Sequence, residues 1–441
     1  MALGLVAFAG GAAAEVAGHA VRPASATSLD DSPYAAMTQL GRVLVTVENE
    51  YVEPVERTKL LNGSIDGMVA GLDPHSSYMS PQDFALFQSD TQGEFGGVGI
   101  EVDAKNEVLT VIAPIEGSPA ERAGVKSGDK LVAVAGETAT GIGLDKMVRK
   151  MRGRPGTHVK LTVRREGVKD PITFDLVREI IRVKSVSSRM LKGDVAYVRI
   201  KQFQDKTHDE LLEAVARLRG ESHGKITGVV LDMRSNPGGL VDEAAEVADE
   251  FLAGGSIYSA RHRGQVVDDV KAHGGGALVD APTVILVNAF TASAAELVTG
   301  ALQDGKRATV VGVQTFGKGS VQTIFELPGG AGMRLTTERY YTPSGHAIQA
   351  DGIHPDVVVS GSEDSLPLPP VRERDLEGHL DAENRGNATT PPRSAVVVDG
   401  GASDDPSLDT SQGSVARNVP FDPDAGKDPM LKIGYGIVTR R

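Results

Sequence analysis

Residues 283–302 read TVILVNAFTASAAELVTGAL, and this stretch decides how the middle of the chain folds. The apolar run Thr283–Val287 predicts a buried strand, and Ser293–Leu302 predicts the helix that follows it. Ser293 therefore lies on a strand-to-helix turn, where free backbone N–H groups and the positive end of the helix dipole would stabilise an oxyanion. Serine at such a turn is also a common helix N-cap, and this segment alone favours the cap.

Strands and helices alternate on both sides of this stretch, between about residues 183 and 359. Strands are predicted at 195–200 and 228–232, and helices at 205–218 and 239–251. Such alternation implies a mixed, largely parallel sheet with functional groups at the carboxyl ends of its strands. The predicted fold class is therefore α/β multidomain, with its core at 183–360.

The rest of the chain differs in texture from this core. Residues 29–95 carry apolar side chains at helical spacing and predict a helical N-terminal subdomain, whereas 96–182 alternate as β-strands do. Residues 361–441 are rich in Pro, Asp, Gly and Ser and have few aromatic side chains. They predict a disordered, acidic, low-complexity tail, with 431–438 as a short docking element.

The composition is that of a soluble globular protein, with 40% hydrophobic and 24% charged residues in a chain of 441. The net charge of −13 argues against nucleic acid as a partner, because such binding needs a basic surface. Without cysteine, the chain has no disulfide, no thiolate metal site and no Cys nucleophile. No stretch reaches the ~18–20 apolar residues that span a bilayer, so membrane association is expected to be peripheral at most.

The N-terminus predicts export from the cytoplasm. Residues 2–14 are almost wholly apolar and small, and Ala24-Ser25-Ala26 resembles a signal-peptidase site, although no Lys or Arg precedes Arg22. A disordered Ala/Gly arm is the alternative. We expect a signal peptide at 1–28, and a location in the periplasm or at the periplasmic side of the membrane.

A nucleophilic serine needs a base, and the chain offers a lysine. Its histidines are scattered, and no Gly-x-Ser-x-Gly surrounds Ser293. Lys318 lies between two glycines in TFGKGSVQ, residues 315–322, and apolar neighbours predict burial, which lowers a lysine pKa. Gln322 lies four residues after Lys318, a spacing that keeps both side chains on one face of a strand or one turn apart in a helix. Gln322 is neutral and could orient the amine by a hydrogen bond without recharging it. The alternative is a structural buried lysine beside a polar glutamine.

The segment LDMRSNPGG, residues 231–239, is the third piece of chemistry. Here a strand ends in a glycine turn that opens a helix, a geometry that exposes backbone N–H groups to an anion. No Gly-Lys-Ser/Thr follows, which excludes a phosphate-binding loop. An oxyanion hole at Gly238 and Gly239 is the better interpretation, and an ordinary strand–helix turn is the alternative.

Together these segments resemble the carboxy-terminal processing peptidases, or tail-specific proteases, of peptidase family S41. The resemblance runs from about Leu40 to Val359 and includes LDPHSSY at 72–78 and RYYTPSG at 339–345. The sequence has no metal-ligand cluster, so no metal and no cofactor are expected. The roles that the resemblance implies are Ser293 as nucleophile, Lys318 as general base, Gln322 as its orienter, and the amides of Gly238 or Gly239 and of Ala294 as oxyanion hole.

The β-rich region resembles a PDZ domain, through GGVGI at 96–100 and SPAERAGVKSGD at 118–129. Consecutive amides in such a glycine loop can bind a terminal carboxylate, and an exposed strand edge accepts an extended peptide. For the loop taken alone, the alternative is an ordinary β-turn. The expected peptide-binding residues are Gly97, Val98, Gly99 and Ile100.

The expected function is a serine endopeptidase that recognises the C-terminal end of protein substrates through its PDZ domain and cleaves them with a Ser-Lys dyad. One rival is a catalytically silent PDZ-containing protein that only binds C-terminal peptides. Another is an α/β hydrolase such as an esterase, which would need a histidine partner. The resemblance also suggests a resting enzyme that holds Lys318 away from Ser293 until peptide or an adaptor protein binds. Assembly into a homo-oligomer is left open.

Overall fold

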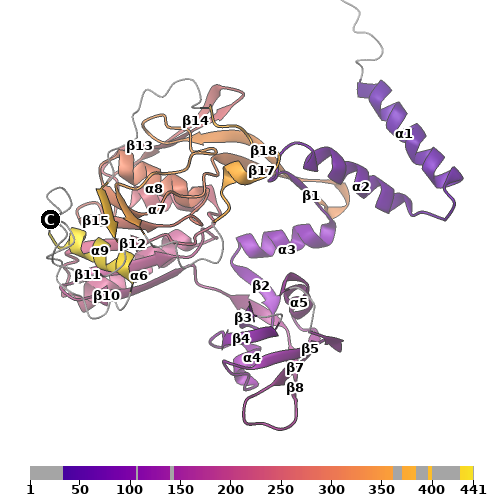
Figure 1. The fold of residues 1–441 in the computed structure, drawn as a ribbon, viewed down its shortest axis with the longest axis horizontal. Helices are drawn as coiled ribbons and strands as arrows, with labels where there is room; N and C mark the ends of the chain where they lie inside the picture. The colour runs from indigo at the N-terminus through magenta and orange to yellow at the C-terminus, as the bar shows by residue number, and fades with distance from the viewer. Residues whose placement is uncertain are drawn as a thin grey trace, which may run out of the picture. The chain divides into compact units, whose positions relative to one another are not determined.

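The computed structural model describes residues 33–105, 108–139, 144–360, 370–383, 396–399 and 428–440. The expected signal peptide at 1–28 and much of the acidic region after 360 lie outside these residues. The chain divides into two units, 1–65 and 66–441. The expected fold class is confirmed, since a PDZ-like sheet and a larger mixed α/β core both lie in the second unit (Figure 1).

The N-terminal subdomain is helical, as its apolar spacing predicts. It contains α1 (Pro33–Glu50) and α2 (Arg57–Ala70), and α3 (Pro81–Thr91) follows in the second unit. Ser80 caps α3, because its side chain accepts the amide of Asp83 and Pro81 occupies the first helical turn. In the part of the chain that the structure describes, no helix combines the length and the apolar character needed to cross a membrane.

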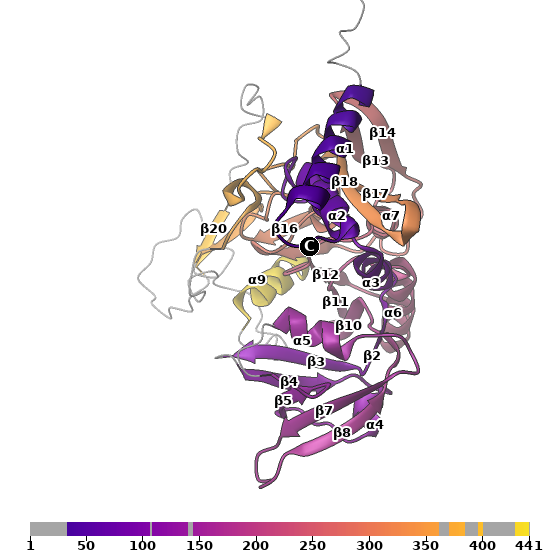
Figure 2. The ribbon, with the colours of Figure 1, turned by 90° about the vertical axis from the view of Figure 1, so that its right-hand side faces the viewer.

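The β-rich region forms a separate sheet of the PDZ type. Its strand order is β3-β4-β5-β7-β8, with β6 paired to β5. β2, which precedes this sheet in the chain, and β9, which follows it, pair with each other. Figure 2 shows the sheet with α5 beside it. The elements are β2 (Glu94–Gly97), β3 (Ile100–Lys105), β4 (Val108–Pro114), α4 (Pro119–Arg122), β5 (Lys130–Val134), β6 (Glu137–Thr138), α5 (Leu144–Met151), β7 (His158–Arg164), β8 (Ile172–Val177) and β9 (Glu179–Arg182).

The core is built on a sheet with the strand order β10-β11-β12-β15-β16-β19-β20. β10 and β11 are antiparallel, and each later neighbour is parallel. This is the mixed, largely parallel sheet expected from the sequence. The elements are β10 (Val186–Leu191), β11 (Val195–Ile200), α6 (Thr207–Glu221), β12 (Gly228–Asp232), α7 (Val241–Asp249), β15 (Thr283–Val287), α8 (Ala294–Asp304), β16 (Ala308–Gly312), β19 (Val357–Ser360), β20 (Val396–Asp399) and α9 (Pro429–Val438).

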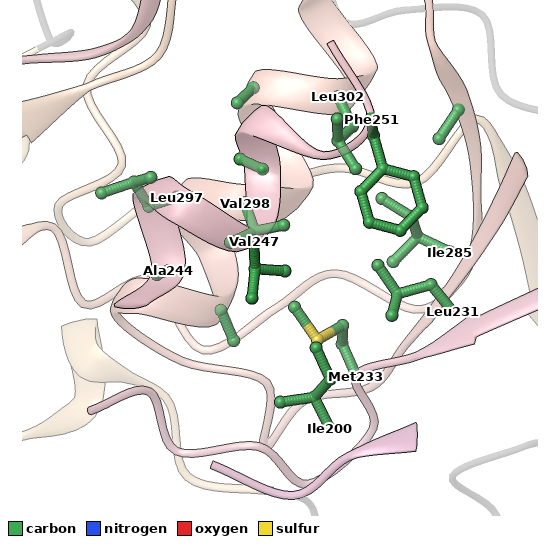
Figure 3. Close-up of a cluster of buried hydrophobic side chains, with 14 of the residues drawn as sticks. Ile200, Leu231, Met233, Ala244, Val247, Phe251, Ile285, Leu297, Val298 and Leu302 are labelled. Carbon is green, nitrogen blue, oxygen red and sulfur yellow. The ribbon is translucent and has the colours of Figure 1, made fainter. Parts of the chain in front are cut away.

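Both faces of this sheet are buried, by different helices. Successive strand residues point to opposite faces, and the two buried clusters divide them in that way. Leu231 and Ile285 pack against α6, α7 and α8, whereas Val230 and Leu286 pack against α9. Figure 3 shows the first cluster, where Phe251, Val298 and Leu302 meet the strand side chains. A fully buried parallel strand must be apolar on both faces, which explains the continuous run in β15.

A second sheet lies beside the core, and its strand β17 directly follows the loop that contains Lys318. Its order is β1-β18-β13-β14, with β17 also paired to β18. The elements are β1 (Ser77–Met79), β13 (Gly255–His262), β14 (Gln265–Ala272), β17 (Ser320–Glu326), the turn η2 (Pro328–Gly330) and β18 (Gly332–Tyr341). Pairing of β1 with β18 brings the 72–78 motif next to β17 and β18.

Part of the region 361–441 belongs to the peptidase core, which corrects the expectation of a disordered tail for those stretches. β20 extends the core sheet in parallel with β19. α9 buries most of its residues against β12, β15 and β16, and it contains the docking element expected at 431–438. Residues 370–383, with the single turn η3 (Glu373–Asp375), pack on the lysine loop. These segments are short, and their apolar side chains or hydrogen bonds are not apparent when composition is averaged over the whole region 361–441.

Candidate active site

Three turns meet at one edge of the core sheet, because neighbouring parallel strands end on the same side. The turn after β12 contains Gly238 and Gly239, the turn after β15 contains Ser293, and the loop after β16 contains Lys318. The backbone joins these turns: Ala292 donates to Asn236 O at 2.9 Å, and Phe316 donates to Thr291 O at 3.0 Å. Sequence positions far apart are therefore brought to one place.

Ser293 sits in a strained conformation at the N-terminus of α8. Its backbone has φ 56° and ψ −124°, in a region that side chains other than glycine rarely occupy. Strain of this kind at a strand-to-helix turn projects the serine hydroxyl out of the sheet edge. Ser293 also caps α8, in a capping box with Glu296. The residue is therefore more than the simple helix cap that its segment alone suggested.

Glu296 joins the serine turn to the lysine loop. Its Oε2 accepts the backbone N–H of Ser293 at 2.8 Å and that of Lys318 at 2.9 Å. Its Oε1 accepts the Gly317 N–H at 2.7 Å and the hydroxyl of Thr315. The carboxyl group is fully buried, and burial raises its pKa to about 7, although these four donors oppose the rise. One side chain thus fixes the backbone on both sides of the candidate dyad.

Sequence reasoning assigned no role to Glu296, although a signal for it was present. The pattern Ser293-x-x-Glu296 matches the capping box, in which the glutamate reaches back to the N-cap amide. The pattern does not predict the bonds that Glu296 accepts from the lysine loop. The bonds to Gly317 and Lys318 come from a loop that follows the next strand, so no local motif contains them.

Lys318 lies in a half-buried position just before β17. Burial lowers the pKa of its amine from 10.5 to about 8, and the positive charge of Arg334 acts in the same direction. The carboxylates of Glu373, Asp73 and Glu296 oppose that shift. A pKa near 8 leaves a substantial neutral fraction near neutral pH, as a general base requires. No hydrogen bond links the Lys318 amine to Ser293 among the residues described.

Gln322 does not bond to Lys318 in this conformation. Its side-chain amide donates to Ser320 Oγ at 3.0 Å, to Ser320 O at 3.3 Å and to Thr336 Oγ1 at 3.2 Å. Lys318 lies outside β17, and the ladder has a register shift between Val321 and Gln322. A bulge interrupts the alternation that was expected to keep both side chains on one face. The orienting role of Gln322 stays a prediction.

The glycine turn packs directly on the serine. A Cβ built at Gly238 would lie 2.8 Å from Ser293 Cβ and 3.0 Å from the amide nitrogen of Ala294. The Gly238 amide already donates to Asn236 Oδ1 at 2.9 Å. The amides of Gly239 and Ala294 have no acceptor within the described part of the chain. Of the three predicted oxyanion donors, these two are free to bind an oxyanion.

The expected peptide-binding residues line a cavity in the PDZ domain. Gly97, Val98, Gly99 and Ile100 form one wall. The facing residues come from β2, from α5 and from the position after α5, and they are Phe95, Val148, Met151 and Arg152. Gly99 has φ +75°, and a Cβ there would lie 2.2 Å from Ser118 Cβ, so the loop requires glycine. Among the residues described, the Val98 and Gly99 amides have no hydrogen-bond acceptor.

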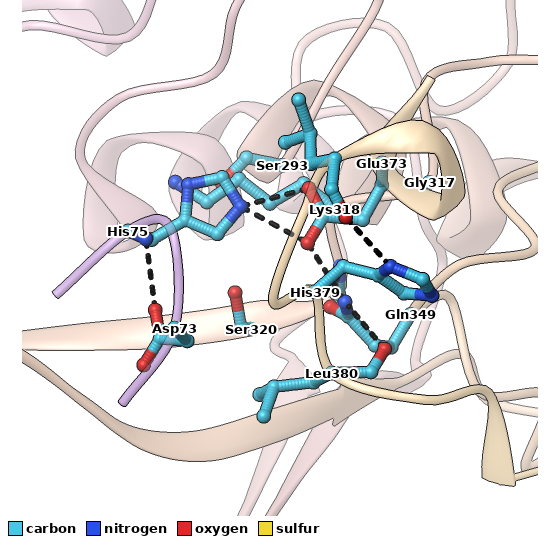
Figure 4. Close-up of polar contacts among 12 residues, drawn as sticks. Asp73, His75, Ser293, Gly317, Lys318, Ser320, Gln349, Glu373, His379 and Leu380 are labelled. Atoms are coloured by element: carbon cyan, nitrogen blue, oxygen red, sulfur yellow. Dashed lines mark hydrogen bonds and ion pairs between the residues drawn. The ribbon is translucent and has the colours of Figure 1, made fainter. Parts of the chain in front are cut away.

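A network that sequence reasoning missed lies on the far side of the lysine loop. His75 Nε2 contacts Glu373 Oε2 at 2.7 Å and Oε1 at 3.0 Å, and Gln349 donates to Glu373 Oε1 at 2.9 Å (Figure 4). Asp73 accepts the amides of His75 and Ser76. Glu373 falls in the region assigned to a tail, and nothing in the sequence around it signals this contact.

In the described ranges, no group of three or more His, Asp or Glu side chains is arranged to hold a metal ion. The polar groups around Ser293 are a lysine amine, a buried carboxyl group and backbone amides. Such a set can deprotonate a hydroxyl and stabilise an oxyanion, which are the two requirements of acyl transfer.

Comparison with known proteins agrees with this chemistry. Residues 194–359 match the family model described as peptidase family S41, and residues 110–165 match the PDZ domain. Residues 9–83 match the activating protease CtpB N-terminal domain.

Similar proteins extend the agreement over most of the chain. A carboxy-terminal-processing protease of Bartonella bacilliformis is 41% identical over 384 residues, covering 83% of this chain and 87% of that protein. A probable CtpA-like serine protease of Staphylococcus aureus is 37% identical over 337 residues, covering 76% of this chain and 66% of its own length. The solved structure of a photosystem II D1 C-terminal processing protease shares 29% identity, covers 73% of this chain and 86% of that chain, and has a TM-score of 0.46.

The family model and the Bartonella bacilliformis relative make the chain a serine-type peptidase. It belongs to peptidase family S41, among the carboxy-terminal processing peptidases that carry a PDZ domain.

Proposed function

We propose that this peptidase captures the C-terminal end of a flexible protein in its PDZ groove and cleaves the chain with a Ser293–Lys318 dyad. The observation that carries the proposal is the shared carboxylate oxygen of Glu296. It accepts the amides of Ser293 and Lys318 together, so the two backbones are held at one atom. The alternative assignment, an esterase, would need a histidine hydrogen-bonded to Ser293, and no histidine bonds to Ser293 in the described structure.

The chemistry follows from the positions of the donors and the base. Neutral Lys318 takes the proton of the Ser293 hydroxyl as the oxygen attacks the substrate carbonyl, and a tetrahedral oxyanion forms. The free amides of Gly239 and Ala294 are the donors proposed for that oxyanion. Collapse expels the amine fragment, which takes a proton from Lys318, and leaves an acyl-enzyme. Water, deprotonated by the same lysine, then hydrolyses the ester.

The missing bond between the Lys318 amine and the Ser293 hydroxyl fits a resting enzyme. Catalytic hydrogen bonds are often long before substrate binds and shorten in the complex. We propose that peptide or an adaptor protein in the PDZ groove brings the amine to the hydroxyl.

The PDZ groove suits an apolar C-terminal residue. Free amides at Val98 and Gly99 can bind the terminal carboxylate, and Ile100, Val148 and Met151 give the last side chain an apolar wall. Arg152 closes one end, where its guanidinium pairs with Asp90 at 2.5 Å and stacks on Phe95. Substrates with an apolar tail and a free carboxylate are therefore the proposed class.

Location and assembly belong to the proposal as well. The apolar stretch at 2–14 and the Ala24-Ser25-Ala26 site support export to the periplasm. Assembly into a homo-oligomer is part of the proposal, with the segment 9–83 that matches the CtpB N-terminal domain as the candidate contact.

The test uses an internally quenched peptide with an apolar C-terminus. Ser293→Ala and Lys318→Ala should each abolish cleavage, while the melting temperature stays close to that of the unaltered protein. Binding of the same peptide should survive in both variants, because the PDZ groove is untouched. Cleavage that persists in both variants would refute the dyad. If the unaltered protein bound the peptide and never cleaved it or a disordered protein, the silent binding protein would be the better assignment.

A further inference from the structure

We propose that residues 370–383 form a strap that positions the lysine loop from outside, and that Glu373 is its positioning residue. The strap is defined by these residues, which follow the last strand of the family match. The inference rests on the proposed role of Lys318 as general base. It adds that the base is held in place by a segment whose composition resembles a tail.

The strap binds the loop immediately before the lysine. Arg372 Nη1 donates to Thr315 O at 2.9 Å and also to Gln314 O. The backbone amide of Glu373 donates to Phe316 O at 3.1 Å. Three consecutive carbonyl groups leading into the Gly317-Lys318 turn therefore accept hydrogen bonds from two adjacent strap residues. This spacing fixes the path of the backbone, since each carbonyl direction is held separately.

The strap also reaches the residue that follows the lysine. Gln349 Oε1 accepts the Gly319 amide at 3.0 Å, and Gln349 Nε2 donates to Glu373 Oε1 at 2.9 Å and to Leu380 O at 3.2 Å. Gly319 lies so close that a Cβ there would be 2.3 Å from Gln349 N. The turn carrying Lys318 is thus connected to the strap at both of its ends.

Glu373 is the central group of this arrangement. Its side chain has an exposed fraction of 0%, and a buried carboxylate is costly unless it is bonded on several sides. His75 and Gln349 supply those bonds. The carbonyl of His75 in turn accepts Arg334 Nε at 2.9 Å. Figure 4 shows His75, Glu373 and Gln349 around the loop that carries Lys318.

Charge gives the strap a second effect on the base. The charged groups that act on the lysine amine come from four elements: Arg334 on β18, Asp73 before β1, Glu296 on α8 and Glu373 on the strap. His75 faces the same cluster through its bond to Glu373. Because the Glu373 carboxylate raises the pKa of Lys318, its removal should lower that pKa and move the acidic limb of the rate profile to lower pH.

The experiment compares full-length Glu373→Gln, Arg372→Met and Glu377→Gln with the unaltered enzyme and with Lys318→Ala. Glu377 is the matched control, because it is an exposed carboxylate on the same strap. The rate of cleavage of the quenched peptide is measured from pH 6 to 10, with kcat and KM resolved. A misplacement of about 1 Å can cost on the order of 100-fold in rate, so we expect a loss of kcat of about that size in Glu373→Gln with KM little changed.

Each variant separates one component of the proposal. Glu373→Gln should show both the loss of kcat and an acidic limb at lower pH, whereas Arg372→Met should lose kcat without that shift. Glu377→Gln should behave as the unaltered enzyme. If Glu373→Gln fails to fold, as thermal melting would show, Arg372→Met decides the question alone.

Full activity in Arg372→Met and Glu373→Gln, or an equal loss in Glu377→Gln, would overturn the strap. If Lys318→Ala is inactive in the same experiment, such a result would refute the strap without contradicting the Ser293–Lys318 dyad. Activity in Lys318→Ala would instead refute the proposed function.

Discussion

The pKa of Lys318 leads to a quantitative prediction for the pH dependence of cleavage. With a pKa of about 8, about one tenth of the amine is neutral at pH 7 and about nine tenths at pH 9. Because the neutral amine is the proposed base, its titration alone should raise kcat/KM about tenfold between these pH values, with a plateau above pH 9. An ordinary lysine with a pKa of 10.5 would still be almost wholly protonated at pH 9.

A second group titrates below this limb and makes its lower part steeper. Burial places the pKa of Glu296 at about 7, so its carboxyl group takes up a proton as the pH falls through 7. The neutral acid accepts the amides of Ser293 and Lys318 less strongly, because a carboxylate is the better acceptor. Below pH 7 the logarithm of kcat/KM should therefore fall with a slope greater than one per pH unit.

The assay needs a measurement that is independent of turnover. In Ser293→Ala, the rate at which acetic anhydride modifies Lys318 can be followed by mass spectrometry from pH 6 to 11, since only the neutral amine reacts. The midpoint should coincide with the upper limb of kcat/KM in the active enzyme. A midpoint near 10.5, or a kcat/KM that stays constant from pH 7 to 9, would refute a lowered lysine pKa as the basis of activity.

Two further predictions concern groups away from the dyad. Asp428→Ala removes the cap of α9 and its two bonds to Arg234, at 3.0 and 2.7 Å, and should lower the free energy of unfolding by about 2 kcal/mol in urea titration; an unchanged unfolding midpoint would contradict the role of this contact. Val148→Asp places a negative charge in the PDZ groove and should raise KM for the apolar-tailed peptide about tenfold, with kcat retained. A peptide with an amidated C-terminus should have a higher KM in the unaltered enzyme, and the substitution should raise that KM by a smaller factor. Equal effects on the KM of both peptides would argue against binding of the terminal carboxylate there.

Local pattern predicted the elements that present the site. The apolar run and helical spacing of 283–302 correctly give β15 and α8, and the glycine turn after β12 indeed lies against Ser293. These predictions succeed because each depends on residues near one another in the chain. The parallel order of β12, β15 and β16 then brings their carboxyl ends together, which the alternation of strands and helices already implies.

What the sequence could not predict are contacts between distant segments. The lowered lysine pKa was expected from apolar neighbours, and the structure adds a positive charge, Arg334, which follows in β18. The expected alignment of Gln322 with Lys318 depended on unbroken strand alternation, and the register shift in β17 breaks it. The bonds between Glu373 and His75 join residues 298 positions apart in the chain, and no periodicity connects them.

The prediction of a disordered tail at 361–441 was wrong for α9 for a related reason. The core sheet explains why this helix packs against it. α6, α7 and α8 cover one face, so Val230, Val284 and Leu286 on the other face would lie in water without a partner. α9 is almost entirely buried on that face, although the region before it averages as polar. Parallel sheets are covered on both faces, and in this chain α9 supplies the cover of the second face.

The same helix is tied to the catalytic edge of the sheet. Its cap, Asp428, bonds Arg234, which also binds Asp232 at the end of β12. Arg234 lies four residues before Gly238, in the turn that packs on Ser293. The strap contacts the loop that carries Lys318, and the cap of α9 contacts the turn that carries Gly238 and Gly239. The region that composition assigns to a tail therefore supports both halves of the site, and truncation before residue 370 should remove activity together with stability.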